Sequence, residues 1–465
     1  MTSIDEEFSG YVNIDNDTFV YNVSDSIVTL LPAQSNLNKI YESFEKVCSR
    51  DTNSSEYLFG LDGKYNIAFM RSNAFYFDRL RLNPVIRFAT PAIIKASGNA
   101  SGYFNNLTDE WTKFHAITFY GGNINSVFDP QLALKGYSDN QQGDGTVGIF
   151  FRPSSAYTHS IDFMLDDKEK VTLTVSVYQS CGRRCTGRRG AHSLGELDTS
   201  IRLSFEEAKD FDSITRYYSI IQKLISILTK QRNVSFDTYL SQMGKDGKYY
   251  QTAVCKIFDG YENYAEINNY GSIQIYQIFE CLPDLLKKIS ENVTQPLLDL
   301  LPLNNRDVKR VSITNIQDLC TALETAYPNQ KREKDALIAE LKREIKKTIK
   351  AFQQSHSDID INSETTLSNC FQHLDFNLRQ KILTLYNDNK NFIDPIIKKY
   401  NLPLINDDTV QAFVNLRNNK THGGIFEMND CVNIYVALFA LVYVQLFKSI
   451  GITDEKIEAI LYRFF

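Results

Sequence analysis

The chain has 465 residues, which is more than one ordinary core can hold and predicts two or three domains. Apolar residues make up 43% and charged residues 23% of the chain, a globular composition that excludes a largely disordered protein. The formal net charge of −6 excludes an overall basic surface, so any contact with nucleic acid must come from a local patch.

Three features of the sequence lead us to expect a cytoplasmic protein without a membrane partner. The first residues, Met-Thr-Ser-Ile-Asp-Glu-Glu, lack the basic start and the apolar core of a secretory signal. The most apolar run, Ile434 to Val444, is well short of the roughly 20 residues that a membrane span requires, so we expect a buried helix there. The 8 cysteines lack the spacing of a disulfide framework, which fits a reducing compartment.

From the start to about residue 200 the pattern is that of short strands. Residues 57–69 carry an Asp-Gly pair between two β-rich arms, which is the strongest short-range signal of a hairpin. Residues 171–178 alternate strictly between apolar and polar side chains. No helical pattern intervenes to make parallel crossovers, so we expect an antiparallel sandwich or barrel.

At Ser204 the period of the pattern changes from 2 to about 3.6 residues, which predicts a helix near 204–230. Ser204-Phe-Glu-Glu207 reads as a capping box, in which the hydroxyl and the carboxylate satisfy free amides at a helix start. Two further β-like runs, 233–239 and 249–258, should complete the first domain.

Beyond about residue 273 only helical patterns follow. Residues 331–352 place apolar side chains on one side of a helix. Lysines and arginines, offset by glutamates, surround that side and form a charged face of the kind that is most often only solvated. Further helices are expected at about 374–400, 409–422, 429–448 and 453–464. The expected fold class is therefore α+β: an N-terminal antiparallel β-rich domain (1–270), a connecting helix (271–300) and an all-α helical bundle (301–465).

One pair of residues in the bundle carries a candidate chemistry, in the segment Leu-Arg-Asn-Asn-Lys-Thr-His-Gly-Gly that contains Arg417 and His422. Asp407 or Asp408 is expected to cap this helix, and the two glycines end it directly after His422. The two side chains diverge by about 140° at the ideal helical period. A relaxed last turn or a partner chain must therefore bring the arginine to the histidine.

The residue types fit cleavage of RNA. His422 can take and return a proton near neutrality, as a general base on a ribose 2′-hydroxyl requires. Arg417 offers a permanent charge and a planar fork to a phosphate whose negative charge grows in the transition state. Arg152 and His159 have a comparable spacing, but the segment between them contains Pro153 and lies between two β-runs. We therefore interpret this second Arg–His spacing as a coincidence in a loop.

The pattern Arg-Asn-x-x-x-His near the end of a helix in a C-terminal bundle resembles the motif of HEPN ribonucleases. The layout resembles the ApeA family of bacterial anti-phage proteins, on the strength of a His-Ala-Ile-Thr-Phe-Tyr-Gly-Gly strand, a Ser-Phe-Glu-Glu-Ala helix and the terminal bundle. This resemblance implies metal-independent endoribonuclease activity in abortive-infection defence. It implies that Arg417, Asn418 and His422 form a composite site at a HEPN homodimer interface, and that the β-rich half is a sensor or regulator.

The resemblance also sets the expected partners. They are an RNA substrate, for which tRNA is one candidate, a second copy of the chain, and a phage-derived trigger. We expect Lys420, in the same segment, to contact RNA. No cofactor is expected for catalysis.

A second unusual segment runs from Cys181 to His192. Cys181, Cys185 and His192 could supply three ligands to a structural zinc ion, but no fourth ligand is evident nearby. Its arginines more plausibly contact RNA phosphate or an acidic protein surface, although many such loops are only solvated. These arginines are Arg183, Arg184, Arg188 and Arg189.

Three other interpretations stay open. The arginine and histidine could simply stabilise the negative end of a helix dipole. The bundle could be a non-catalytic HEPN dimerisation module that binds nucleotide or RNA without cutting it. The β-rich domain could be the active part, for example as a carbohydrate-binding sandwich, although no paired carboxylates support glycosidase chemistry.

Overall fold

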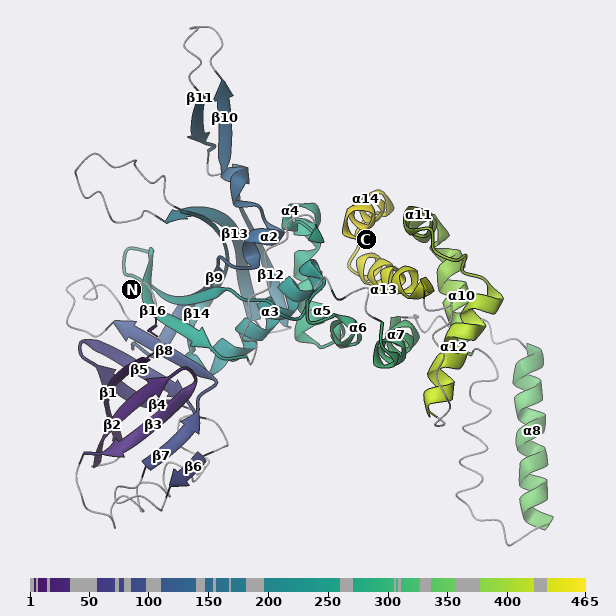
Figure 1. Cartoon of the computed structure of the whole chain (residues 1–465), viewed down its shortest axis with the longest axis horizontal. Helices are drawn as coiled ribbons and strands as arrows, with labels where there is room; N and C mark the ends of the chain where they lie inside the picture. The colour runs from purple at the N-terminus through teal and green to yellow at the C-terminus, as the bar shows by residue number, and fades with distance from the viewer. Residues whose placement is uncertain are drawn as a thin grey trace. The chain divides into compact units, whose positions relative to one another are not determined.

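The computed structural model is an α+β protein in which a large antiparallel sheet is followed by helices (Figure 1). The chain divides into two compact units, unit 1 (1–229 and 233–290) and unit 2 (230–232 and 291–465). The residues that the structure describes are 4–5, 7–14, 17–33, 57–71, 75–78, 85–97, 110–138, 147–153, 156–166, 169–180, 196–259, 271–304, 307, 311–326, 336–355, 377–421 and 433–465.

Unit 1 is built on one antiparallel sheet, with a separate two-stranded ribbon of β10 and β11 (Figure 1). The order of the 14 described strands in the large sheet is β12-β13-β14-β9-β15-β16-β8-β5-β4-β1-β2-β3-β7-β6. The strand bounds are β1 (Glu7–Ile14), β2 (Asp17–Ser24), β3 (Ile27–Pro32), β4 (Tyr57–Asp62), β5 (Tyr65–Met70), β6 (Phe75–Asp78), β7 (Val85–Ala89), β8 (Ala92–Ser97), β9 (Lys113–Tyr120), β10 (Leu134–Ser138), β11 (Val147–Phe151), β12 (Thr158–Asp166), β13 (Glu169–Ser180), β14 (Glu196–Asp210), β15 (Asp237–Met243) and β16 (Tyr249–Ile257).

The predicted hairpin and the predicted alternating strand are both present. Strands β4 and β5 pair antiparallel, and Gly63 in their turn has φ of 57°, which glycine adopts without the steric cost of a Cβ atom. In β13 the apolar side chains of Val171, Leu173 and Val175 are fully buried on one face of the sheet. The period-2 pattern therefore predicted which face of this strand meets the core.

Helix α3 (Ile214–Thr229) covers that apolar face. Its Tyr217 ring lies 4.6 Å from the ring of Phe205 on β14, and its Tyr218 ring lies 6.4 Å from that of Phe119 on β9. Helix α5 (Leu282–Ser290) packs on β12 and α3. The shorter helices of unit 1 are α2 (Ile124–Val127), η2 (Pro130–Ala133), η4 (Phe211–Ser213), α4 (Ile275–Ile278) and η6 (Phe279–Cys281).

The prediction that Ser204 caps a helix is wrong. Ser204 lies within β14 and pairs with Thr172 on β13 and Ala116 on β9. Both edges of the strand are therefore hydrogen-bonded, which satisfies the backbone more completely than a local capping box does. The helix begins only at Ile214, after the turn η4.

A network of charges ties β13 to β14 and α3. The carboxylate of Glu169, a side chain with 9% exposure, lies 2.8 Å from Lys209 Nζ and 3.0 Å from Arg216 Nη1, and it accepts a hydrogen bond from the Tyr217 hydroxyl. Arg216 also pairs with Asp166 at 3.0 Å. Burial acts to raise the pKa of Glu169, but these hydrogen bonds and positive charges hold the pKa below its usual value.

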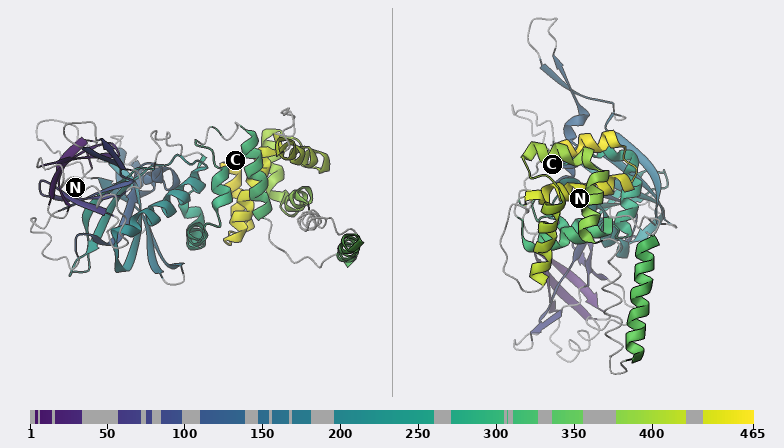
Figure 2. Two further views of the ribbon diagram at one scale, coloured as in Figure 1. Left: turned by 90° about the horizontal axis from the view of Figure 1, so that it is seen from below. Right: turned by 90° about the vertical axis from the view of Figure 1, so that its right-hand side faces the viewer.

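Unit 2 is helical in its described part, and Figure 2 shows helix α13 among the other helices of the bundle. Helix α13 packs against α7, α11 and α14, while α12 packs against α7 and α10. The helix bounds are α6 (Gln295–Leu300), α7 (Ile313–Ala326), α8 (Ala336–Ser355), α10 (Leu378–Asp388), α11 (Lys390–Tyr400), α12 (Asp407–Thr421), α13 (Tyr435–Ser449) and α14 (Asp454–Phe464).

Two predicted helices differ from the structure. The run expected at 374–400 is two helices, because Asn389 leaves helical geometry with φ of −130° and ψ of 20° between α10 and α11. In α8 the apolar stripe is not buried as in a packed bundle helix, since Leu341 is 51% and Phe352 54% exposed.

The apolar run at 434–444 forms the buried helix that we predicted. It lies in α13, where Tyr443 is fully buried between Phe447 and Phe464, with ring centroids 5.8 and 5.1 Å away. In the described part of the chain, no helix combines the length and the apolarity that crossing a membrane requires.

Candidate functional site

Helix α12 carries the predicted arginine. Its N-terminus is capped by Asn406, whose Oδ1 accepts the backbone N–H of Thr409 at 2.9 Å while the Thr409 hydroxyl accepts the Asn406 N–H at 3.0 Å. The prediction that Asp407 or Asp408 is the cap is therefore wrong by one or two residues. Both aspartates lie in the first turn, where their charges favour the positive end of the helix dipole.

Packing fixes the direction of α12. Val410 and Phe413 are fully buried, and at the helix start Arg379 of α10 bonds Asp407 and Gln411, each at 3.2 Å. One side of α12 therefore rests on α10 and α7, and Arg417 follows one turn after Phe413 along that side.

Arg417 pairs with a glutamate that the motif did not reveal. Its Nη1 lies 3.5 Å from Oε1 of Glu324 on α7, and the two side chains are 32% and 34% exposed. The guanidinium is thus held at the bundle surface, where an anionic ligand can reach it. Its charge also acts on the neighbouring Cys320, although burial dominates and raises the pKa of that thiol to about 12.

The structure describes the other predicted residues of the motif only in part. Asn418 and Lys420 belong to α12, but their side chains lie outside the described residues, as does the whole of His422. The helix is regular from Arg417 through Thr421. The end of the last turn at His422 lies outside the described residues, so the alternatives of a relaxed last turn and of a partner chain both stay open.

The predicted zinc ligands and the arginine cluster of 181–192 also lie outside the described residues. Their segment connects β13 to β14, which pair from Ser180 and Glu196 onward. The residues concerned are Cys181, Cys185 and His192 for zinc, and Arg183, Arg184, Arg188 and Arg189 for RNA phosphate.

The Arg152 and His159 pair has structural contacts. Arg152 Nε donates to the carbonyl of Leu134 at 3.1 Å. The His159 ring lies 6.1 Å from the ring of Phe128 and 5.5 Å from that of Phe279. His159 lies in strand β12 rather than in the loop that we expected.

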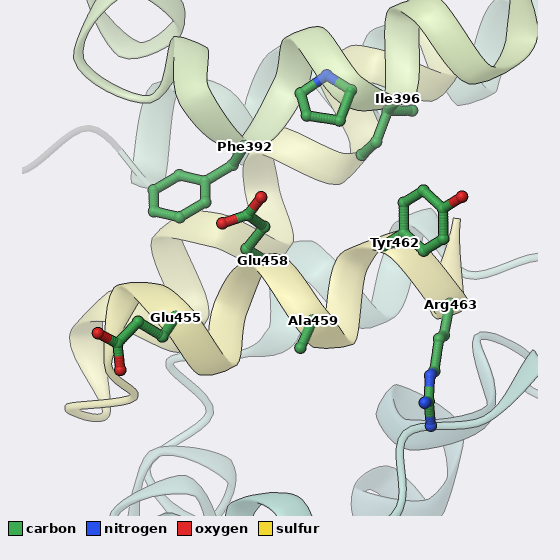
Figure 3. A pocket seen from close by; sticks show the side chains of 8 residues that line it. Phe392, Ile396, Glu455, Glu458, Ala459, Tyr462 and Arg463 are labelled. Carbon is green, nitrogen blue, oxygen red and sulfur yellow. The ribbon is translucent and has the colours of Figure 1, made fainter.

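Unit 2 also has a surface hollow of about 470 Å³ between α11 and α14 (Figure 3). Phe392 and Ile396 project from α11, and α14 contributes Glu458 and Tyr462 among others (Figure 3). Among the residues whose side chains the structure describes, none of α12 lines this hollow. It is therefore separate from the surroundings of Arg417.

In comparisons with known proteins, no family model, no curated protein and no solved structure matches the chain.

Proposed function

We propose that this protein is a metal-independent endoribonuclease of the HEPN type. The observation that carries the proposal is the placement of Arg417, a partly exposed guanidinium near the end of helix α12 in a helical bundle, held there by Glu324 of α7. A permanent cation at a bundle surface fits recognition of an RNA phosphate. The resemblance of Arg417, Asn418 and His422 to the HEPN motif adds the proton-transfer group.

In the proposed reaction His422 takes the proton of a ribose 2′-hydroxyl, and the oxygen attacks the adjacent phosphorus. The bond from phosphorus to the 5′-oxygen breaks, that oxygen takes up a proton, and the products are a 2′,3′-cyclic phosphate and a 5′-hydroxyl end. Arg417 balances the charge that grows on the phosphate oxygens. Asn418 and Lys420 would orient and hold the phosphate.

The active species is proposed to be a homodimer through the bundle. At the ideal helical period, side chains five positions apart, such as those of Arg417 and His422, diverge by about 140°. Two copies related by a two-fold axis could bring both arginines and both histidines around one phosphate.

The biological setting proposed from the resemblance is abortive infection in a bacterial cytoplasm. Unit 1 would sense a phage-derived trigger and restrain unit 2 until that trigger binds. Cellular RNA, including tRNA, would then be the substrate.

The Arg417–Glu324 pair also favours one alternative, a non-catalytic HEPN module. A guanidinium that is already paired with a carboxylate can serve as a bundle ion pair and bind RNA without any cleavage. The two functions differ in whether His422 is needed for a chemical step.

The test compares the full-length protein with its His422→Ala variant on labelled RNA in EDTA, together with toxicity on expression. We expect the wild type to cut RNA and leave 2′,3′-cyclic phosphate ends, and the variant to bind RNA without cutting. Binding by both proteins with cleavage by neither, and without toxicity, would establish the non-catalytic module. Cleavage that strictly requires magnesium would refute the metal-independent mechanism.

A further inference from the structure

Five side chains of unit 1 form a row on one face of the sheet, the face opposite α3. The strand register places Tyr178 of β13 opposite Asp198 of β14, and Tyr120 of β9 opposite Asp237 of β15. Tyr239 follows Asp237 by two residues and so shares its face. We call these five residues the tyrosine–aspartate row.

The three rings of the row are in contact. The Tyr120 ring lies 5.8 Å from the ring of Tyr178 and 5.4 Å from that of Tyr239. All three side chains are partly exposed. Burial and the charges of Asp237 and Asp198 raise the pKa of Tyr120 to about 12, so its phenol is neutral at physiological pH.

The charge of one carboxylate of the row acts on the other. Partial burial and the charge of Asp198 raise the pKa of Asp237, although Lys256 on the neighbouring strand β16 acts in the opposite direction. Asn125 donates a hydrogen bond of 3.0 Å to Asp198. Asp237 still reaches solvent. The row therefore combines two like charges with three electron-rich ring faces.

A second observation on the same face points to a ligand. Thr118 lies two residues before Tyr120 on β9 and directly opposite Tyr239 on β15. Its side chain is 1% exposed, and its hydroxyl has no hydrogen-bond partner in the structure. A buried hydroxyl without a partner is costly, and such a group is commonly satisfied by a bound molecule or water.

We propose that the tyrosine–aspartate row binds an organic cation that carries an ammonium or guanidinium group. The faces of tyrosine rings attract such a group, and its N–H donors match the carboxylate oxygens of Asp198 and Asp237. A bound cation also removes the repulsion between the two carboxylates. The Thr118 hydroxyl can accept a further hydrogen bond from the same ligand.

This proposal does not rest on RNA cleavage, because every residue of the row belongs to unit 1 and none belongs to α12. It gives the β-rich unit a recognition chemistry of its own. The cation can be a free small molecule or a basic side chain of a peptide, and two probes distinguish these sources.

The experiment is titration calorimetry on the full-length protein with arginine amide, with its neutral isostere citrulline amide, and with a hexa-arginine peptide. We expect arginine amide to bind at least about tenfold more tightly than citrulline amide. Binding of the peptide but not of the free amide would assign the cation to a protein partner. Equal affinity for arginine amide and citrulline amide would overturn the proposal.

Two substitutions and two controls locate the binding. Asp237→Asn should weaken binding of the cationic probe by roughly fivefold, and Tyr120→Leu by about tenfold. The controls are Glu207→Gln, which removes one charge from an exposed position of β14, and Tyr11→Leu, which removes an exposed ring from β1. Thermal unfolding checks the fold of each variant. If Asp237→Asn and Glu207→Gln weaken binding equally, the cation binds the acidic surface nonspecifically and the proposal fails.

Discussion

The ion pair between Arg417 and Glu324 allows a quantitative prediction for Glu324→Gln. Both side chains are about one third exposed, at 32% and 34%, and the closest atoms are 3.5 Å apart. Such a pair contributes only about 0.2 to 1 kcal/mol to stability. An RNA phosphate that binds Arg417 would have to displace the Glu324 carboxylate. If so, Glu324→Gln should make the free energy of RNA binding more favourable by at most the same amount, which raises the affinity up to about fivefold.

The assay measures fluorescence anisotropy at low salt with an RNA that carries 2′-O-methyl groups and so cannot be cut at those positions. Urea unfolding should show a loss below about 1 kcal/mol, so a change in affinity would not reflect unfolding. Glu458→Gln is the matched control, since Glu458 is an exposed glutamate of the same unit in α14. Unchanged or weaker RNA binding by Glu324→Gln, or an equal gain in Glu458→Gln, would refute the competition.

Three further predictions follow from the same geometry and charges. Arg417→Lys should lower the rate of RNA cleavage by about 100-fold, because an ammonium keeps the charge but loses the planar fork; a full rate in gel assays would show that charge alone suffices. A 1:1 mixture of His422→Ala and Arg417→Ala subunits should recover part of the wild-type rate, because about half of the dimers that form at random keep one arginine and one histidine at the shared phosphate. A mixture no more active than either variant, or sedimentation of the active protein as a monomer, would contradict the shared site. Glu169 has a lowered pKa when folded, so its stabilising contribution is present above about pH 4.5 and is lost as the pH falls through the folded value. Glu169→Gln should therefore flatten the decline of the urea midpoint between pH 6 and 3, and an unchanged decline would exclude this network as its cause.

The parts of the fold that the sequence predicted correctly are those that depend on local periodicity. The alternation in β13, the Asp-Gly turn before β5 and the apolar run of α13 each placed an element and its buried face. The role of Ser204 was mispredicted because its backbone pairs with two neighbouring strands, and this pairing is favoured over the local capping pattern. Competition of this kind depends on which strands become neighbours, and a window of a few residues does not contain that information.

In the candidate site, too, the sequence revealed the residue that has a local signal and missed the residue that depends on packing. Arg417 was found by its spacing within a helix end, which is a local signal. Glu324 lies 93 residues earlier and meets Arg417 only because α7 packs against α12. The tyrosine–aspartate row was missed for the same reason, since its members come from four strands whose order differs from their order in the chain. No spacing motif could have connected them.

The chain passes from unit 1 to unit 2 at Lys230. The contact that Lys230 makes determines when the segment around it can pack during synthesis. Its ammonium, nearly fully buried, donates to the backbone carbonyl of Phe464, a residue 234 positions later in the chain. At typical ribosomal rates this partner emerges roughly 10 to 50 seconds after Lys230 does. Until then the lysine keeps its ordinary charge, whereas burial and the charge of Lys399 lower its pKa to about 7 in the finished bundle. The buried contact of Lys230 can therefore form only after the last helix has been made, and the lowered pKa means that its formation favours loss of the lysine's proton.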